Sequence, residues 1–168
     1  MDKIRHLEDK DLNIILEWRN HPSIRKSMLS QHVITMSEHL DWYKSISSNK
    51  NFIPMIYEEE NLSVGYVSFS LICNTHSADW GFYSSPFSPK GTGIRMGVAA
   101  LDFAFKELNL EEIYGQTLIS NKISQNFHSK LGFKKENLST RQSKYDLKYH
   151  EIICYSLKQA DWLNNEKS

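Results

Sequence analysis

Residues 84–105, SSPFSPKGTGIRMGVAALDFAF, place two glycines one residue apart directly before a long segment with helical apolar spacing. Glycine weakens regular structure, so Gly91 and Gly93 indicate a backbone that needs unusual freedom or a close approach by another group. Residues 78–84, just before, have the alternation of a strand. From Gly91 onward one helix face is formed by Ile94, Val98, Leu101, Phe105 and Leu108. The segment predicts a strand, a tight turn and a helix that covers a sheet.

The remaining chain predicts further strands and helices without repeats or linkers. Strands are expected at residues 4–7, 51–57, 63–72, 112–119, from 133 onward and 150–157, and helices at 8–20, 38–46 and 121–133. In the second of these helices, Leu40 is expected on the buried face. Antiparallel strands come first and two β-α-β crossovers follow, so we predict a single α/β (α+β) domain over residues 1–168. Its mixed, mostly antiparallel sheet would carry helices on both faces.

Charge and composition limit the classes of partner. Lys plus Arg equals Asp plus Glu at 20 each, so neither nucleic acid nor a membrane surface is an expected partner. The first residues are charged, and no apolar run approaches the ~20 residues of a membrane span, so we expect a cytoplasmic protein. Two distant cysteines predict reduced thiols, and the histidines lack metal-ligand spacing, so no metal is expected.

The glycine turn is a candidate anion site. The first amides of a helix have no acceptor inside it, and the helix dipole favours negative charge there. Gly91 and Gly93 would leave access open, Thr92 would add a hydroxyl and Arg95 a positive charge, which suits a pyrophosphate. Met96 stands where a dinucleotide-binding fingerprint has its third glycine, and a Walker loop is absent. A strand-to-helix turn without any ligand is the plainer alternative.

A second group of polar residues follows the predicted strand 112–119. Asn121, Ser124 and His128 have the spacing of one polar helix face, whereas Ile123 and Phe127 are expected to point inward.

Together the two motifs resemble the GCN5-related N-acetyltransferase superfamily, which has a Q/R-x-x-G-x-G/A turn and a downstream N-x-x-A-x-x-x-Y-x-x-x-G-F segment. The matching positions are Gly91, Gly93, Asn121, Gly132 and Phe133. The chain departs from the pattern with Ser88 for the usual Arg or Gln, Ser124 for Ala and His128 for Tyr.

This resemblance implies acetyl-CoA as co-substrate and a sheet splayed at the strands DWGFYSS and IYGQTLI, with pantetheine between them. Backbone groups near Phe82 and Tyr83 would bind the pantetheine amides, and one N–H would polarise the thioester carbonyl. The cofactor-binding residues that it implies are Phe82, Tyr83, Gly91, Thr92, Gly93, Ile94, Arg95, Met96, Asn121, Ser124 and Phe127.

The resemblance also implies direct attack of a neutral amine on acetyl-CoA. His128, in place of the superfamily tyrosine, is our hypothesis for the general acid, because imidazole titrates near neutrality. Packing at the helix end and a bond to CoA are the alternatives for His128. For the general base we consider Asp79 acting through water, Tyr83, or bulk water alone.

The segment WRNHP and the helix beginning EHL resemble the acetyltransferases of pseudaminic acid biosynthesis, which act on the 4-amino group of UDP-4-amino-4,6-dideoxy-N-acetyl-β-L-altrosamine. A nucleotide-sugar amine is therefore the expected acceptor, with Arg19, Asn20, His39 and Trp42 as candidate contacts. Alternatives are an acetyltransferase of protein N-termini, with a related opening, and a CoA-binding module without turnover. A homodimer is left open.

Overall fold

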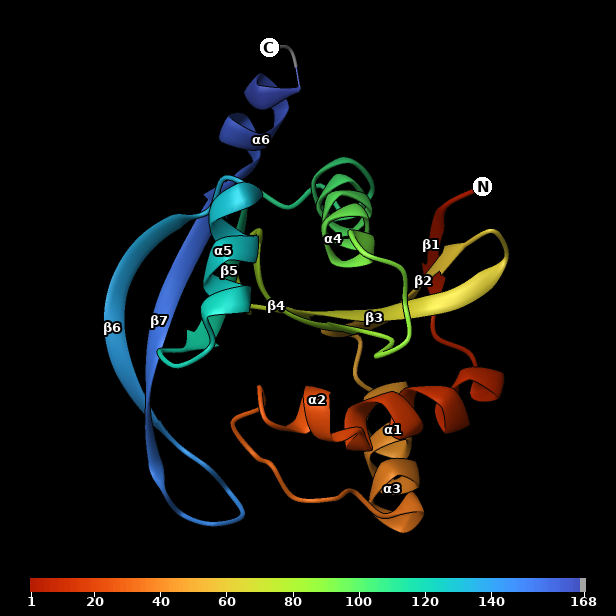
Figure 1. Ribbon diagram of the computed structural model, residues 1–168. Helices are drawn as coiled ribbons and strands as arrows, with labels where there is room; N and C mark the ends of the chain where they lie inside the picture. Colours follow the sequence, from red (N-terminus) through yellow and green to blue (C-terminus); the bar gives the residue numbers. More distant parts are fainter. Residues whose placement is uncertain (167–168) are drawn as a thin grey trace.

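The computed structural model describes residues 1–166 and contains a seven-stranded mixed sheet with the strand order β1-β2-β3-β4-β5-β7-β6 (Figure 1). Neighbouring strands are antiparallel except for β4 and β5, which are parallel. The strands are β1 (Lys3–His6), β2 (Phe52–Glu59), β3 (Leu62–Leu71), β4 (Ser77–Ser84), β5 (Glu112–Leu118), β6 (Lys134–Gln142) and β7 (Tyr149–Lys158). The predicted fold class is confirmed.

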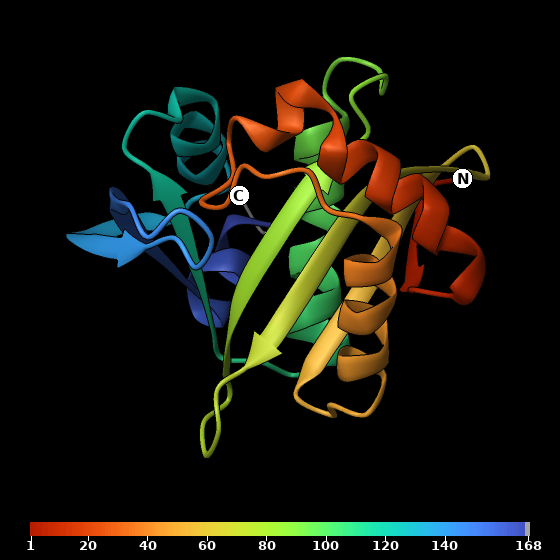
Figure 2. The ribbon, with the colours of Figure 1, turned by 90° about the horizontal axis from the view of Figure 1, so that it is seen from below.

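Helices cover both faces of this sheet. On one face lie α1 (Leu12–Asn20), which follows a 3-10 turn (Asp9–Asp11), α2 (Pro22–Arg25) and α3 (Met36–Ser47) (Figures 1 and 2). The helices α4 (Thr92–Asp102), extended by a π-helical turn (Phe103–Glu107), and α5 (Lys122–Lys130) lie on the other, and α6 (Gln159–Asn165) follows β7.

Two short helices, α2 and α6, are absent from the sequence prediction. Pro22, two residues beyond the helix predicted at 8–20, stands at the first position of α2. Its fixed φ suits that position, where an amide hydrogen would have no partner.

The sheet opens between β4 and β5. Their pairing covers only the stretch from Ser77 with Glu112 to Asp79 with Tyr114, whereas β5 pairs with β7 along its whole length. Beyond Asp79 the two parallel strands diverge, and the splayed sheet that the resemblance implies is confirmed. The crossover from β4 through α4 to β5 joins neighbours, whereas the second one, through α5, passes over β7 to β6.

The face of α4 that packs on the sheet differs from the expected one. Met96, Ala100 and Leu101 are buried in the main core, but Val98 remains 39% exposed. The expectation for Val98 is wrong because Met96 and Ala100 form the surface of α4 that packs on the sheet. The helix is therefore rotated so that Val98 points away from the sheet.

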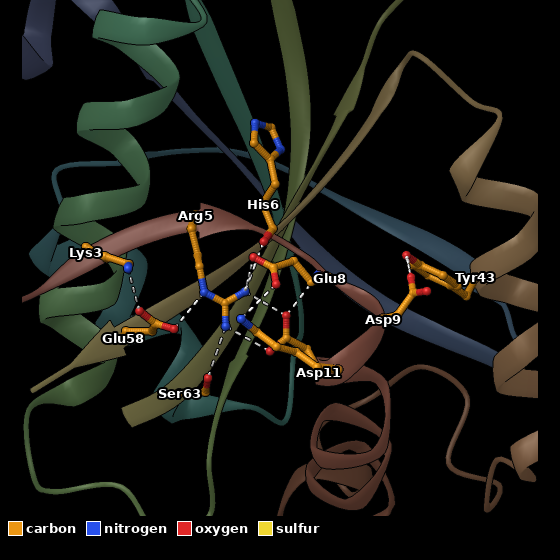
Figure 3. Close-up of polar contacts among 10 residues, drawn as sticks. Lys3, Arg5, His6, Glu8, Asp9, Asp11, Tyr43, Glu58 and Ser63 are labelled. Carbon is orange, nitrogen blue, oxygen red and sulfur yellow. Dashed lines mark hydrogen bonds and ion pairs between the residues drawn. The ribbon is translucent and has the colours of Figure 1, made fainter. Parts of the chain in front are cut away.

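A charged cluster around Arg5 fixes the start of α1 against the sheet edge (Figure 3). Both terminal nitrogens of Arg5 donate to the buried carboxylate of Asp11, at 2.7 and 2.9 Å, and its Nε donates to Glu58 at 2.7 Å. Burial alone would raise the pKa of Asp11, but the hydrogen bonds from Arg5 and the Glu8 backbone leave it lowered. The cluster joins β1, β2 and the 3-10 turn, and so anchors the α1–α2 segment that borders the site described next.

Candidate active site

A cavity of about 550 Å³ occupies the opening between β4 and β5. Residues 80–84 of β4 and 116–118 of β5 form two of its walls. The starts of α4 and α5 contribute further residues, and α2 with the loop after it, together with β6 and β7, completes the lining. Strand divergence therefore produces a site to which elements from distant parts of the chain contribute.

The start of α4 meets this cavity at Gly93. Gly91 is the N-cap residue and has a φ of 90°, a left-handed conformation that favours glycine. A Cβ placed on Gly93 would meet no atom within 4 Å, so the protein's own packing does not require glycine there. The amide of Gly93 belongs to the first helical turn, which lacks acceptors within the helix. The geometry is therefore open to an anion at the predicted position.

Four of the predicted cofactor residues do not line the cavity: Gly91, Thr92, Ile94 and Arg95. Arg95 donates from Nε to Glu59 at 2.7 Å and from Nη2 to the hydroxyl of the buried Thr92 at 3.2 Å. Ile94 packs against the main core. Arg95 and Thr92 therefore belong to a polar network with β2, contrary to their expected role as anion ligands.

On β4, Phe82 and Tyr83 line the cavity as expected. The ring of Tyr83 stacks on Tyr66 with centroids 4.9 Å apart, and burial raises the pKa of Tyr83 well above its ordinary value. A phenol with a raised pKa stays protonated at neutral pH, so Tyr83 is unsuited to the role of general base.

Asp79 lies outside the cavity, at the last paired position before the strands diverge. Partial burial raises the pKa of its carboxyl. A shift in this direction suits a proton acceptor, but the Asp79 side chain is exposed and does not line the cavity, although the next residue, Trp80, does. The structure does not bring Asp79 together with the other predicted site residues.

Three predicted residues of α5 line the cavity: Asn121, Ser124 and Phe127. Asn121 caps the helix, because its Oδ1 accepts from the amide of Ser124 at 3.1 Å. Ile123, expected to point inward, is 81% exposed, so that expectation is wrong.

His128 does not share the polar face predicted for it. Its side chain is completely buried and stacks on Tyr155, with ring centroids 4.8 Å apart. The remaining aromatic neighbours of its ring are Trp80, Phe82, Phe127 and Phe133. The prediction that His128 shares a polar face is wrong because its imidazole fills a space in the core between α5 and the sheet.

Both ring nitrogens of His128 have protein partners. The indole N–H of Trp80 donates to Nε2 at 3.2 Å, which leaves the proton on Nδ1, and Nδ1 donates to the Ser124 carbonyl at 2.8 Å. Burial lowers the pKa of His128 to about 4. A neutral, fully bonded imidazole that does not line the cavity is unsuited to act as general acid, and packing, the alternative reading, fits the geometry.

We expect the buried imidazole to make stability depend on pH. The unfolded chain takes up a proton near its ordinary pKa of about 6.5, whereas folded His128 does so only at about 4. Stability is therefore unaffected above about pH 6.5 and falls as the pH drops toward 4, by about 2 kcal/mol at pH 5. Urea unfolding at about pH 7 and pH 5 measures this loss, and His128→Phe should largely remove it.

His39, whose pKa burial also lowers, is present in both proteins and so cancels from that comparison. An equal loss in wild type and His128→Phe would contradict the assignment. We further expect the turnover of His128→Phe to keep the wild-type pH profile, which an imidazole acting as acid would not allow.

The four predicted acceptor contacts do not line the cavity. His39 is buried, donates from Nε2 to the Leu12 carbonyl at 2.8 Å and stacks on Trp42, so both residues join α3 to α1. They replace Leu40, which is exposed, as the packed face of α3. The side-chain amide of Asn20 makes two 2.8 Å bonds to the backbone of Ile34 and holds the α2–α3 loop.

Arg19 is half-buried behind Tyr83. Its Nη2 donates to the Ser30 carbonyl at 2.8 Å, and Nη1 has no partner among residues 1–166. Burial lowers the pKa of the guanidinium, and the neighbouring Tyr83 opposes that shift. Arg19 therefore adds positive potential behind one wall of the cavity without lining it.

Sequence reasoning missed the residues that α2, the following loop, and β5 to β7 contribute. They include Lys26, Met28, Thr117 and Arg141, whose Nη1 donates to Gln116 at 2.5 Å. Lys26 and Arg141 are the cations of the lining, and among the residues that border the cavity in the described part of the chain none is Asp or Glu. No local pattern signals these residues, because each reaches the cavity only through the folding of the sheet.

Neither a metal centre nor a membrane span is found in the described chain. Across residues 1–166, no three His, Cys, Asp or Glu side chains are grouped so that they could hold a metal ion. Within the same range no helix has both the length and the apolar character needed to cross a bilayer.

A splayed mixed sheet with a glycine-opened helix start at the gap defines a class of acyl-transferring enzymes. The sequence profile of the acetyltransferase (GNAT) domain matches residues 3–134, and the chain therefore belongs to this family. The protein is an N-acetyltransferase.

Three relatives illustrate its position within the family. Acetyltransferase PseH of Campylobacter jejuni strain 81-176 is 29% identical over 119 residues, which cover 69% of this chain and 72% of that protein. Spermidine N(1)-acetyltransferase of Escherichia coli K12 is 24% identical over 168 residues, covering 99% and 90%. Among solved structures, Vibrio cholerae spermidine N-acetyltransferase in complex with CoA and spermine has a TM-score of 0.86 at 21% identity, covering 97% of this chain and 98% of that one.

Proposed function

We propose that the protein transfers the acetyl group of acetyl-CoA to the amine of an anionic small molecule, the 4-amino group of a UDP-linked amino-dideoxy sugar. The observation that carries the choice of acceptor is the charge of the cavity, whose lining contains Lys26 and Arg141 and no carboxylate among the described residues. The sugar itself comes from the resemblance of the N-terminal segment to the acetyltransferases of pseudaminic acid biosynthesis.

The start of α4 supports acetyl-CoA as the donor. The space above Gly93 is open on the cavity side, and the first-turn amides with the helix dipole favour a diphosphate. Phe82 and Tyr83 present the backbone of β4 to the gap where its partner strand has moved away. Unpaired strand groups there are suited to the amides of pantetheine. One N–H in this stretch would serve as the donor that stabilises negative charge on the thioester oxygen.

The cavity charge disfavours a polyamine acceptor. A polyamine carries several positive charges at neutral pH and requires nearby carboxylates, whereas Lys26 and Arg141 would repel it. The diphosphate of a nucleotide sugar would be attracted by the same two cations. Spermidine is nevertheless the main competing acceptor, because enzymes named for spermidine match nearly the whole chain in sequence and in fold.

The residues that line the cavity can bind the substrates and polarise the thioester, but none of them is suited to act as general base. Tyr83 stays protonated, and Asp79 lies outside the cavity. We therefore propose that the neutral amine attacks the thioester directly and that its proton leaves to water. Loss of that proton should limit the rate at low pH, where the acceptor amine is protonated before it binds.

Thiol release from acetyl-CoA, followed with a chromogenic thiol reagent, tests this function. The acceptors are the UDP-4-amino-4,6-dideoxy sugar, spermidine, a short peptide with a free N-terminus, and none. Release that depends on the UDP-amino sugar supports the proposal. Faster release with spermidine or the peptide would overturn the acceptor, and binding of acetyl-CoA without release under any condition would indicate a module without turnover.

The two cavity cations provide a variant test of acceptor charge. In the double variant Lys26→Ala/Arg141→Ala, we expect KM for the UDP-amino sugar to rise about 10-fold, because two charge-assisted contacts are lost. KM for acetyl-CoA should change much less. Added salt should reduce the difference between variant and wild type in KM for the UDP-amino sugar. Lys44→Ala, an exposed position on α3, is the matched control. An unchanged acceptor KM would contradict the role of the two cations.

A further inference from the structure

Thr117, on β5, carries a buried hydroxyl without a protein partner. The residue is 5% exposed and lines the cavity, and its Oγ1 has no hydrogen-bond partner within residues 1–166. Leaving such a group unpaired destabilises the folded protein, so its presence calls for a partner that the free protein lacks. Arg19, His32 and His150 also have buried polar atoms without a partner within residues 1–166. Of these four residues, Thr117 is the one that lines the cavity.

The strand register places Thr117 at the middle of the gap. The last β4–β5 pair is Asp79 with Tyr114, and three residues further along each strand stand Phe82 and Thr117. Phe82 is the β4 residue whose backbone we propose for thioester binding. Thr117 therefore faces that position from the opposite wall.

Alternation along β5 places the Thr117 hydroxyl on the donor side of the sheet. Gly115, two residues earlier, faces α5, since a Cβ there would lie 2.4 Å from Nε2 of His128. Thr117 shares this face. The helix α2, which ends one residue before Lys26, lies on the opposite face (Figure 1). The hydroxyl is thus directed toward acetyl-CoA and away from the acceptor wall.

Other polar groups of this wall are already engaged. The Asn121 side chain caps α5, and both nitrogens of His128 are bonded within the protein. The Ser124 hydroxyl is only partly buried and lies 3.5 Å from Nδ1–H of His128, from which it can accept but to which it cannot donate. Thr117 is left as the buried hydroxyl with its proton uncommitted.

We propose that Thr117 is a catalytic residue whose Oγ1–H donates a hydrogen bond to the thioester sulfur as the carbon–sulfur bond breaks. This inference rests on the proposed use of acetyl-CoA. The amine nitrogen forms the new bond to the carbonyl carbon, the electron pair of the broken bond stays on sulfur, and the amine's proton goes to water. Thr117 keeps its proton and stabilises the thiolate. Thr117 thereby assists the departing thiolate, which His128 cannot do because its imidazole is buried.

Thr117→Val, which replaces the hydroxyl by a methyl group of similar size, and Thr117→Ser, which keeps the hydroxyl, test the inference. We expect Thr117→Val to lower kcat about 10- to 100-fold with KM for acetyl-CoA within about twofold, and Thr117→Ser to keep kcat within about threefold of wild type. The melting temperature of Thr117→Val should equal or exceed that of wild type, because an unpaired buried group is removed. A merely structural threonine would not separate kcat from stability in this way.

A second measurement is independent of the acceptor. The pKa of the thiol of bound CoA, followed by the ultraviolet absorbance of the thiolate, should rise by about one unit in Thr117→Val relative to wild type. An unchanged thiol pKa, or a rise only in KM for the acceptor, would overturn the inference. If wild type bound CoA but acetylated a different amine, the titration would still test whether Thr117 stabilises the thiolate. Absence of CoA binding in wild type would instead refute the proposed function, and this inference with it.

Discussion

Gly93→Val is expected to raise KM for acetyl-CoA by about 10- to 100-fold, which corresponds to a loss of about 1.4–2.8 kcal/mol of binding free energy. In the free protein a Cβ at this position meets no atom within 4 Å, so the new side chain occupies only space that faces the cavity. The same space gives an anion access to the first-turn amides of α4. Steady-state kinetics and calorimetry with acetyl-CoA measure the change.

The stability of this variant distinguishes obstruction from damage. Glycine in a helix is about 0.5–1 kcal/mol less stable than alanine, so Gly93→Ala should unfold at the same or a higher temperature while KM still rises. Val98→Ala, at an exposed position of the same helix, is the control and should leave KM unchanged. Unaltered acetyl-CoA binding in Gly93→Val would mean that the diphosphate is bound elsewhere, and the donor site would have to be abandoned.

Gly115→Ala should lower the free energy of unfolding by about 1–3 kcal/mol, the range for overpacking a filled core. The added Cβ would lie 2.4 Å from Nε2 of His128 and 2.9 Å from Nε1 of Trp80. Neither ring can move freely, because His128 is completely buried among aromatic rings and the two side chains are hydrogen-bonded to each other. Urea unfolding measures the loss.

Two further variants make this prediction specific. Gly81→Ala, on the neighbouring strand β4, would place its Cβ 3.4 Å from the Ser68 hydroxyl and should change stability by less than about 1 kcal/mol. In the background of His128→Ala the imidazole is gone and Trp80 can shift into the space it leaves, so adding Gly115→Ala should cost less than in wild type. Such non-additivity is the signature of direct contact. Full additivity of the two losses would show that Gly115 does not make room for His128.

Local sequence signals were sufficient for the scaffold of the site. The change from strand alternation to helical spacing around Gly91 predicted β4, the turn and α4, because each signal depends only on neighbours in the chain. The order of elements predicted the mixed sheet and, with the motif resemblance, its splay at β4 and β5. The short helices α2 and α6 were missed, since segments of four and seven residues carry too little periodicity to be recognised.

Assignment of individual side chains was less successful. His128 has the spacing of a polar face with Asn121, yet it is buried because Gly115 on β5 leaves room and Trp80 on β4 supplies a hydrogen bond. His39 in α3 was expected at the acceptor and Leu40 in the core, but the structure reverses the two, since a backbone carbonyl of α1 satisfies the imidazole. In both cases a partner distant in sequence decides whether a polar ring can be buried.

By itself, the sequence determined the family, the strand–turn–helix unit and an open backbone at Gly93, because these follow from residue type and from spacing along one element. Only the tertiary structure decided which side chains surround the gap. The divergence of β4 from β5 places Thr117, with its buried and unpaired hydroxyl, in the lining of the cavity, and the course of α2 and β6 brings Lys26 and Arg141 to the same cavity. Periodicity indicates which residues share a face, but whether that face meets a filled core or an empty cavity depends on the elements packed against it.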